Sequence, residues 1–193
     1  MTTDEIKGLI GSKLEDVKLK RVQDSLLIEN PLDLIPVAKL IRDCPELELD
    51  YLSSVTGADY VDYLESVYFF YSMKNKTGPL LLRVRVSKDS PHVPSLVPVF
   101  RGAEYQEREA YDMYGILYDG HPDLRRLFMW EGFEGYPMRK DYTQEDSETL
   151  EKADIEWLER ENINVSAEVR RNAEELSKKG SRALPNKKSK SKS

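Results

Sequence analysis

The side chains best suited to chemistry gather in one stretch of the chain, residues 104–142. Four of them could form an acid/base site, because histidine titrates near neutrality and carboxylates can orient its ring. These four are Glu107, Glu109, Asp112 and His121. No nucleophile, metal-binding motif or cofactor-binding loop accompanies them in the sequence. We therefore weigh this acid/base hypothesis against a solvated charged helix and against a polar network.

The polar network is the hypothesis that the spacing favours. Arg108 lies four residues from both Glu104 and Asp112, so on a helix one guanidinium can sit between two carboxylates. Residues 120–123 read Gly-His-Pro-Asp, which is typical of a turn. Cations that match the helix acids follow at Arg125, Arg126, Arg139 and Lys140. Because buried Arg–carboxylate pairs fix geometry better than they add stability, we expect this network to lock an extended arm and present it to a partner protein.

The hydrophobic periodicity predicts an α+β fold, a small mixed sheet of about five strands packed by helices. Helices are expected at 3–11, 33–44 and 103–114, with a helical turn capped by Ser95, and strands at 17–22, 25–29, 47–56, 66–73 and 79–86. A turn is expected at Gly57, and Gly115 should end the third helix in a left-handed conformation. The strand at 66–73 is apolar on both faces, so one face should cover a helix or a partner.

The chain divides into four predicted regions. Residues 1–115 form an α+β core domain. Residues 116–142 form an extended irregular arm, since a long stretch without periodicity inside a compact domain usually signals function. Residues 143–179 are expected to be a helical extension, and residues 180–193 a disordered tail rich in lysine and serine.

The composition argues against several classes of protein. The chain has one cysteine, Cys44, and two histidines, His92 and His121, whereas an iron–sulfur cluster normally needs about four thiolates, so any cofactor should belong to another protein. The net charge is −6, but residues 178–193 hold seven basic residues and no acid. That leaves −13 for residues 1–177, which argues against broad nucleic-acid binding. No apolar run approaches the roughly 20 residues of a membrane-spanning helix, and no signal sequence is visible, so we expect the chain in the cytosol.

Three blocks in the third helix and the arm carry a family resemblance. They are Glu107-Arg108-Glu109-x-x-Asp112-Met113-Tyr114-Gly115, Gly120-His121-Pro122-Asp123-Leu124-x-Arg126 and Gly135-Tyr136-Pro137-Met138-Arg139-Lys140-Asp141-Tyr142. Together they resemble the signature of the thirty-kilodalton subunit of NADH-quinone oxidoreductase, or respiratory complex I. The resemblance covers residues 25–142, and Thr143 stands where the family often carries a proline.

The resemblance implies a non-redox subunit in the peripheral arm of a membrane-associated NADH:quinone oxidoreductase. Electrons would pass from NADH through FMN and iron–sulfur clusters in other subunits to quinone, coupled to proton translocation. This chain would then hold no catalytic residue, cofactor or metal of its own. The family's C-terminal arm wraps the large quinone-site subunit, which is the expected chief partner. The expected location is the cytoplasmic side of the inner (plasma) membrane, reached through the complex and without a transmembrane segment.

The polar network and the resemblance together predict a partner interface. It comprises Glu107, Arg108, Glu109, Asp112, Gly115, His121, Pro122, Asp123, Arg125, Arg126, Pro137, Arg139, Lys140 and Asp141. Two alternatives stay open at this point. The corresponding subunit of a membrane-bound hydrogenase or a deazaflavin-dependent dehydrogenase shares the signature. A free-standing nucleic-acid or lipid-binding module could instead act through the basic tail.

Overall fold

The computed structural model describes residues 2–130, 132–142, 152–160, 165–167 and 170–171. Residues 1–142 form one compact unit and residues 143–193 a second. The second unit contains helix α4 (Lys152–Arg160), within the stretch where the sequence predicts a helical extension. The predicted tail lies outside the described residues. The candidate site lies entirely in the first unit.

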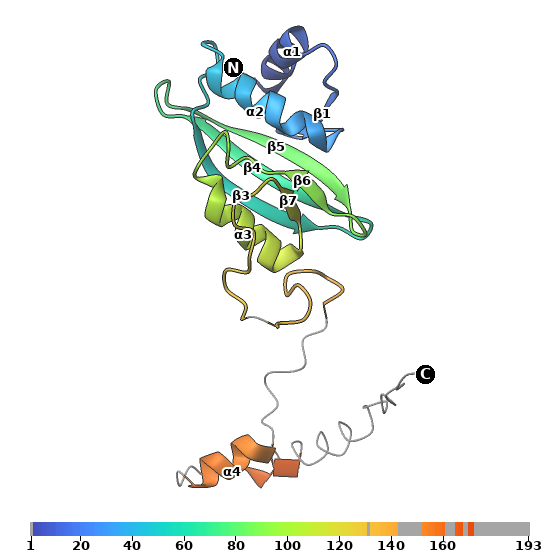
Figure 1. The fold of residues 1–193 in the computed structure, drawn as a ribbon, viewed down its shortest axis with the longest axis vertical. Coiled ribbons are helices and arrows are strands. Elements are labelled where there is room, and N and C mark those ends of the chain that lie inside the picture. The colour runs from blue at the N-terminus through green and yellow to red at the C-terminus, as the bar shows by residue number, and fades with distance from the viewer. Residues whose placement is uncertain (1, 131, 143–151, 161–164, 168–169, 172–193) are drawn as a thin grey trace, which may run out of the picture. The chain divides into compact units, whose positions relative to one another are not determined.

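The first unit is built on a five-stranded mixed sheet in the order β1-β2-β5-β4-β3, which confirms the predicted α+β class (Figure 1). The strands are β1 (Leu19–Val22), β2 (Ser25–Ile28), β3 (Tyr51–Asp59), β4 (Tyr63–Ser72) and β5 (Thr77–Ser87). β1 and β2 form the predicted short hairpin, and β3, β4 and β5 form an antiparallel meander. The two parts join because β2 pairs in parallel with β5.

Alternation along the strands gives the sheet two different faces. In β5, every second residue from Leu80 to Val86 is buried on one face, whereas Arg83 and Arg85 point to the other. The helices of this unit are α1 (Thr3–Lys13), α2 (Leu34–Asp43) and α3 (Ala103–Tyr114), and their buried apolar side chains share one hydrophobic core with the apolar face. In Figure 1, α1 and α2 lie at the β1 end of the sheet, and α3 lies beside β3.

Local sequence explains where the first two helices begin. Thr2 and Glu5 form a capping box, in which each side chain accepts a hydrogen bond from the other residue's backbone N–H. Before α2, Asn30 accepts from the Leu32 N–H at the start of a 3-10 turn (Pro31–Asp33). Asp33 is the N-cap residue of α2, as predicted, although its side chain makes no capping hydrogen bond. The buried side chains of α2 recur every three or four residues, which fits its amphipathic pattern.

The third strand is displaced from its predicted position. The sequence predicts a strand at 47–56 followed by a turn at Gly57, but β3 continues to Asp59 with Gly57 inside it, paired with Ser66. Leu47 instead belongs to a turn in which its N–H donates to the Cys44 carbonyl. Gly57 serves close packing here, because a Cβ atom at this position would overlap the ring of Tyr114.

A second, two-stranded sheet was not predicted. It consists of β6 (His92–Pro94) and β7 (Leu117–Asp119), which pair in parallel on either side of α3 in the sequence. The helical turn predicted at Ser95 is reduced to turns in which the Val99 and Phe100 N–H groups donate to the Leu96 carbonyl. A strand of three residues is too short to show a hydrophobic period in the sequence. The pairing of β6 with β7 depends on α3, which connects them along the chain. No helix among the described residues is long and apolar enough to cross a membrane.

Candidate partner-binding site

α3 carries much of the predicted interface, and it buries charged side chains. Glu107, Arg108 and Asp112 are 0%, 5% and 0% exposed, whereas Glu109 is exposed. The helix ends as predicted at Gly115, which has a left-handed φ of 73°. Burying an ionisable group is costly unless hydrogen bonds or opposite charges compensate, so the partners of these three side chains define the site.

A side chain of α3 also protects the edge of the sheet. β3 is an edge strand, and Gln106 donates to the Ser53 carbonyl at 3.3 Å and accepts from the Val55 N–H at 2.5 Å. The amide therefore pairs with the free edge as a neighbouring strand would. Together with the packing of Tyr114 on Gly57, this fixes α3 against β3.

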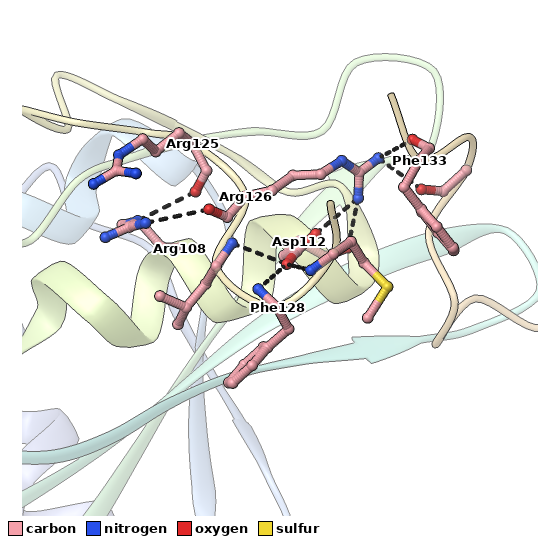
Figure 2. A network of polar contacts seen from close by, with 9 residues as sticks. Arg108, Asp112, Arg125, Arg126, Phe128 and Phe133 are labelled. Atoms are coloured by element: carbon pink, nitrogen blue, oxygen red, sulfur yellow. Dashed lines mark hydrogen bonds and ion pairs between the residues drawn. The ribbon is translucent and has the colours of Figure 1, made fainter. Parts of the chain in front are cut away.

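Asp112 holds the middle of the arm (Figure 2). Its Oδ2 accepts hydrogen bonds from three successive backbone N–H groups, those of Leu127 (2.9 Å), Phe128 (2.6 Å) and Met129 (2.9 Å). Its Oδ1 accepts from the Arg126 guanidinium at 2.8 Å. Burial alone would raise the pKa of this carboxyl group, but the N–H donors and Arg126 outweigh burial, and the pKa lies below its ordinary value. Asp112 thus remains a carboxylate in the interior.

Arg126 extends this network further along the arm. The same guanidinium that pairs with Asp112 also donates to the carbonyls of Phe133 (3.1 Å) and Gly135 (2.9 Å). Its charged centre lies 5.4 Å from the centre of the Phe133 ring and 5.2 Å from that of Tyr136. One side chain therefore joins α3 to two later points of the arm.

Arg108 makes different contacts from those its spacing suggests. The expected position between Glu104 and Asp112 is wrong: Arg108 donates to the carbonyls of Arg125 and Arg126, at 3.2 Å each. Figure 2 shows these two bonds on the helix side of the arm. Asp112 is already occupied by donors of the arm, and the arm's backbone in turn offers Arg108 two acceptors. The polar network is present, but it runs between helix and arm instead of along the helix.

Glu107 lies outside this network. Its Oε2 accepts from the Ser95 hydroxyl at 2.6 Å and its Oε1 from the Leu96 N–H at 2.7 Å, so it ties α3 to the segment after β6. No cation pairs with it among the described residues, and burial raises its pKa to about 7. The Ser95 and Leu96 donors lower the pKa but only partly offset burial.

The predicted turn at 120–123 is fastened to α3 by its histidine. His121 Nε2 donates to the Glu104 carbonyl at 2.9 Å, and Nδ1 accepts from the Asp123 N–H at 3.0 Å, which assigns the proton to Nε2. Asp123 pairs with Arg125 at 2.8 Å on the exposed side. Pro122 is exposed.

The last predicted interface residues fasten the end of the arm to α3. Arg139 donates to the Tyr114 carbonyl at 2.6 Å and stacks on the Tyr136 ring at 4.6 Å. The Tyr136 ring and Arg139 lie against Gly115, where a Cβ atom would collide with both. Glycine is therefore required at the end of α3 for close approach as well as for its left-handed φ.

β3 holds the same end of the arm at a second point. The Lys140 N–H donates to Asp59 Oδ2 at 2.6 Å, and Lys88 forms an ion pair with Asp59 Oδ1 at 2.6 Å. The side chains of Lys140 and its neighbour Asp141 are exposed, and Pro137 is partly buried.

Three of the four residues of the acid/base hypothesis have separate partners, and the fourth is exposed. Glu107 bonds to Ser95 and Leu96, Asp112 to the arm and His121 to the Glu104 carbonyl, while Glu109 is exposed. Glu107, Asp112 and His121 thus bond to other groups instead of to one another. Among the described residues, no group of three or more His, Cys, Asp or Glu side chains is placed to hold a metal ion. The contacts of Glu107, Asp112 and His121 fit the fixing of neighbouring segments onto α3.

The structure adds three apolar residues that sequence reasoning missed. Phe128, Trp130 and Met138 are 61%, 68% and 55% exposed, and all three lie on the arm. Their signal in the sequence was present, since large apolar side chains in an irregular segment cannot all enter a core. They are the type of residue that forms anchors at protein interfaces.

Fold and site define a small α+β protein whose buried charges fix a C-terminal arm onto a helix. The family described as respiratory-chain NADH dehydrogenase, 30 Kd subunit, matches residues 28–148, and the chain belongs to this family. This confirms the resemblance seen in the three sequence blocks.

Two relatives, both named as C 2 subunits of NADH-quinone oxidoreductase, show the degree of similarity. The one from Rhizobium meliloti (strain 1021) is 46% identical over 118 residues, which are 58% of this chain and 62% of that protein. The one from Rhizobium etli (strain CIAT 652) is 39% identical over 138 residues, 68% of this chain and 71% of that protein. The chain thus spans about two thirds of the length of these two relatives.

The fold itself is found in a solved respiratory assembly. A chain in the structure of the membrane-bound sulfane sulfur reductase, an archaeal respiratory membrane complex, matches 85% of this chain and 93% of its own length. The TM-score is 0.53 and the sequence identity is 19%, so this likeness concerns the fold alone.

Proposed function

We propose that this chain is a non-redox subunit in the peripheral arm of a membrane-associated NADH:quinone oxidoreductase, on the cytoplasmic side of the membrane. In this proposal, electrons pass from NADH through FMN and iron–sulfur clusters in other subunits to quinone, coupled to proton translocation. The chain's own role is assembly: its arm binds the large quinone-site subunit. Family membership supports the complex, and the names of its relatives support the reaction.

The observation that carries the assembly role is the contrast between the two sides of the arm. Asp112, Arg126 and Arg108 hold the backbone of the arm on α3, whereas Phe128 and Trp130 stay more than half exposed. An apolar side chain on a fixed backbone loses less conformational freedom on binding than one on a mobile segment. The arm therefore offers pre-ordered anchors to a partner.

The non-redox role rests on the ligands that the sequence offers. A single cysteine and two histidines fall short of the set of about four ligands that a cluster takes from one chain. Cys44 is buried, and its hydrogen-bond partners are Lys13 and Glu46 instead of a histidine. Electron transfer would then belong to other subunits.

The test is assembly of the complex around a tagged full-length chain. The double variant Phe128→Ser/Trp130→Ser should reduce the yield of assembled complex at least about tenfold, because it removes two exposed apolar anchors. Val61→Ser is the matched control, since Val61 is 81% exposed in the turn between β3 and β4. Circular dichroism and thermal melting of the free chain should be unchanged in both variants.

Two results would overturn the proposal. One is full assembly of the Phe128→Ser/Trp130→Ser variant, measured by native gel electrophoresis and NADH:quinone activity. The other is a flavin or iron–sulfur absorption band in the purified chain, which we expect to be colourless. Mass spectrometry of the co-purified subunits decides between complexes, because a nickel-site subunit in place of a flavin–NADH subunit would assign the chain to a hydrogenase.

A further inference from the structure

One face of the sheet carries apolar side chains that lie outside the hydrophobic core of the described residues 2–142. Strand pairing places Leu27, Val67, Phe69, Leu81, Arg83 and Arg85 on it, and we call these six residues the open sheet face. Phe69 pairs with Leu81, and Arg83 with both Val67 and Leu27, so the six form one continuous surface across β2, β5 and β4.

The open sheet face is separate from the hydrophobic core. Leu27 and Val67 are 5% and 7% exposed, yet neither belongs to the core cluster that contains the other faces of β2, β4 and β5. The remaining elements pack on the opposite side: Tyr118 of β7 hydrogen-bonds Ser66 at 2.9 Å, and the Tyr114 ring of α3 packs on Gly57, which pairs with Ser66. Phe69, Leu81, Arg83 and Arg85 are partly exposed, and an apolar face that is partly open to water is typical of an interaction surface.

The charged end of this face carries more positive than negative charges. Glu65, whose side chain is fully buried, lies 2.6 Å from Arg85 Nε and 3.3 Å from Arg83 Nη1. Two guanidinium groups thus share one carboxylate. Arg83 Nε is buried and has no hydrogen-bond partner among the described residues. A buried N–H group of this kind is costly unless an acceptor reaches it.

We propose that the open sheet face binds an apolar segment of another protein subunit that carries an aspartate or glutamate. The apolar side chains of that segment cover Phe69 and Leu81. Its carboxylate supplies the second negative charge that would balance Arg83 and Arg85. This contact is distinct from the arm, and it shares with the proposed function only the assumption that the partner belongs to the same complex.

Charge complementarity selects this occupant over a second copy of the chain. Two copies joined through the same face would bring four arginines and two glutamates together, which leaves the excess positive charge unbalanced and buried. The excess is also local, because residues 1–177 carry a net charge of −13. A carboxylate is therefore attracted to this face of the chain and repelled from most others.

Photocrosslinking in the assembled complex tests the proposal. The full-length chain carries p-benzoylphenylalanine in place of Phe69, or in place of Trp130 as a separate probe of the arm. Position 69 should crosslink to one peptide of another subunit, with an aspartate or glutamate within a few residues of the crosslinked site. No crosslink, a crosslink to a second copy, or one to residues 143–193 of the same chain would overturn the proposal. The result at position 130 decides the proposed function independently.

A charge variant tests the role of the missing carboxylate. Leu81→Glu places a carboxylate on the open sheet face two residues from Arg83, where it fills the role that we assign to the partner. The crosslink from position 69 should then fall at least about tenfold, since 1.4 kcal/mol already changes binding tenfold. Leu81→Gln is the uncharged control and should lose less. Equal crosslinking in Leu81→Glu and wild type, with the melting temperature retained, would contradict the proposal.

Discussion

Asp112 and Arg126 form a buried ion pair at 2.8 Å between helix and arm, and each of the two residues also has hydrogen-bond partners other than the other. Asp112 also accepts hydrogen bonds from three backbone N–H groups of the arm, and Arg126 also donates hydrogen bonds to two carbonyls of the arm. The pair therefore orders backbone as well as side chains. Because a buried ion pair adds little net stability, its main effect here is to specify the path of the arm.

Asp112→Asn should loosen the middle of the arm without unfolding the sheet. The amide cannot accept all the charge-assisted bonds of the carboxylate, and we expect a local cost of about 2–4 kcal/mol. Hydrogen exchange at the N–H groups of Leu127, Phe128 and Met129 should then accelerate about 100-fold, since 1.4 kcal/mol corresponds to tenfold. Asp123→Asn is the control, because Asp123 pairs with Arg125 on the exposed side. Unchanged exchange at Leu127–Met129 in Asp112→Asn would mean that other contacts hold the arm.

The same residue sets an acid limit for the arm. The pKa of Asp112 is depressed in the folded chain, so its contribution to stability is fully present above the ordinary carboxyl pKa of about 4 and is lost as pH falls further. Exchange at the three N–H groups should therefore stay constant down to about pH 4 after correction for intrinsic rates. Arm opening that begins near neutral pH would contradict this assignment.

The network was predictable in kind but not in connectivity. Helical spacing identified Arg108 and Asp112 as partners because it compares positions on one helix only. In the folded chain the arm crosses both residues and offers stronger partners, three N–H donors to Asp112 and two carbonyls to Arg108. The choice between local and distant partners depends on the path of the arm, which has no periodicity to reveal it.

The fold divides in the same way between local and distant information. The ends of α3 and the β1–β2 hairpin follow from nearby residues, and the sequence located both. Gly57 looked like a turn because glycine is common in turns, whereas its position inside β3 reflects Tyr114, a residue far along the chain. That β4 has apolar residues on both faces was visible in the sequence, but only the structure shows that Val67 and Phe69 lie outside the hydrophobic core of the described residues.

Gly57→Ala tests the close approach of α3 to β3. The added methyl group would overlap the Tyr114 ring, and we expect a loss of about 1–3 kcal/mol in the free energy of unfolding, measured by denaturant titration. In a Tyr114→Ala background the same substitution should cost much less, because the ring is gone. Gly8→Ala is the control: nothing lies within 4 Å of an added Cβ in α1, and the change should stabilise by about 0.5–1 kcal/mol. Additive costs at Gly57 and Tyr114 would exclude the contact.

Glu107→Gln should change the pH dependence of stability. The pKa of Glu107 is raised from 4.5 to about 7, so the folded chain binds this proton more tightly, and stability falls as pH rises from 4.5 through 7. Glutamine cannot ionise. The variant should therefore exceed wild type by on the order of 3 kcal/mol above pH 7 and by little at pH 4.5. Denaturant titrations at several pH values measure this difference, with the exposed Glu109→Gln as control. A difference that does not vary with pH would refute the proton uptake.

Arg126→Lys tests whether the shape of the guanidinium group, beyond its charge, holds the arm. Lysine keeps the charge but presents a single ammonium, which cannot reach Asp112, the Phe133 carbonyl and the Gly135 carbonyl together. Chymotrypsin should then cleave after Phe133 at least about tenfold faster, because local opening governs cleavage of a folded segment. Arg125→Lys is the matched control, since the Arg125 side chain pairs with Asp123 at the surface. Equal cleavage rates for Arg126→Lys and wild type would show that charge alone is sufficient, and the arm would then depend on Asp112 and its backbone donors.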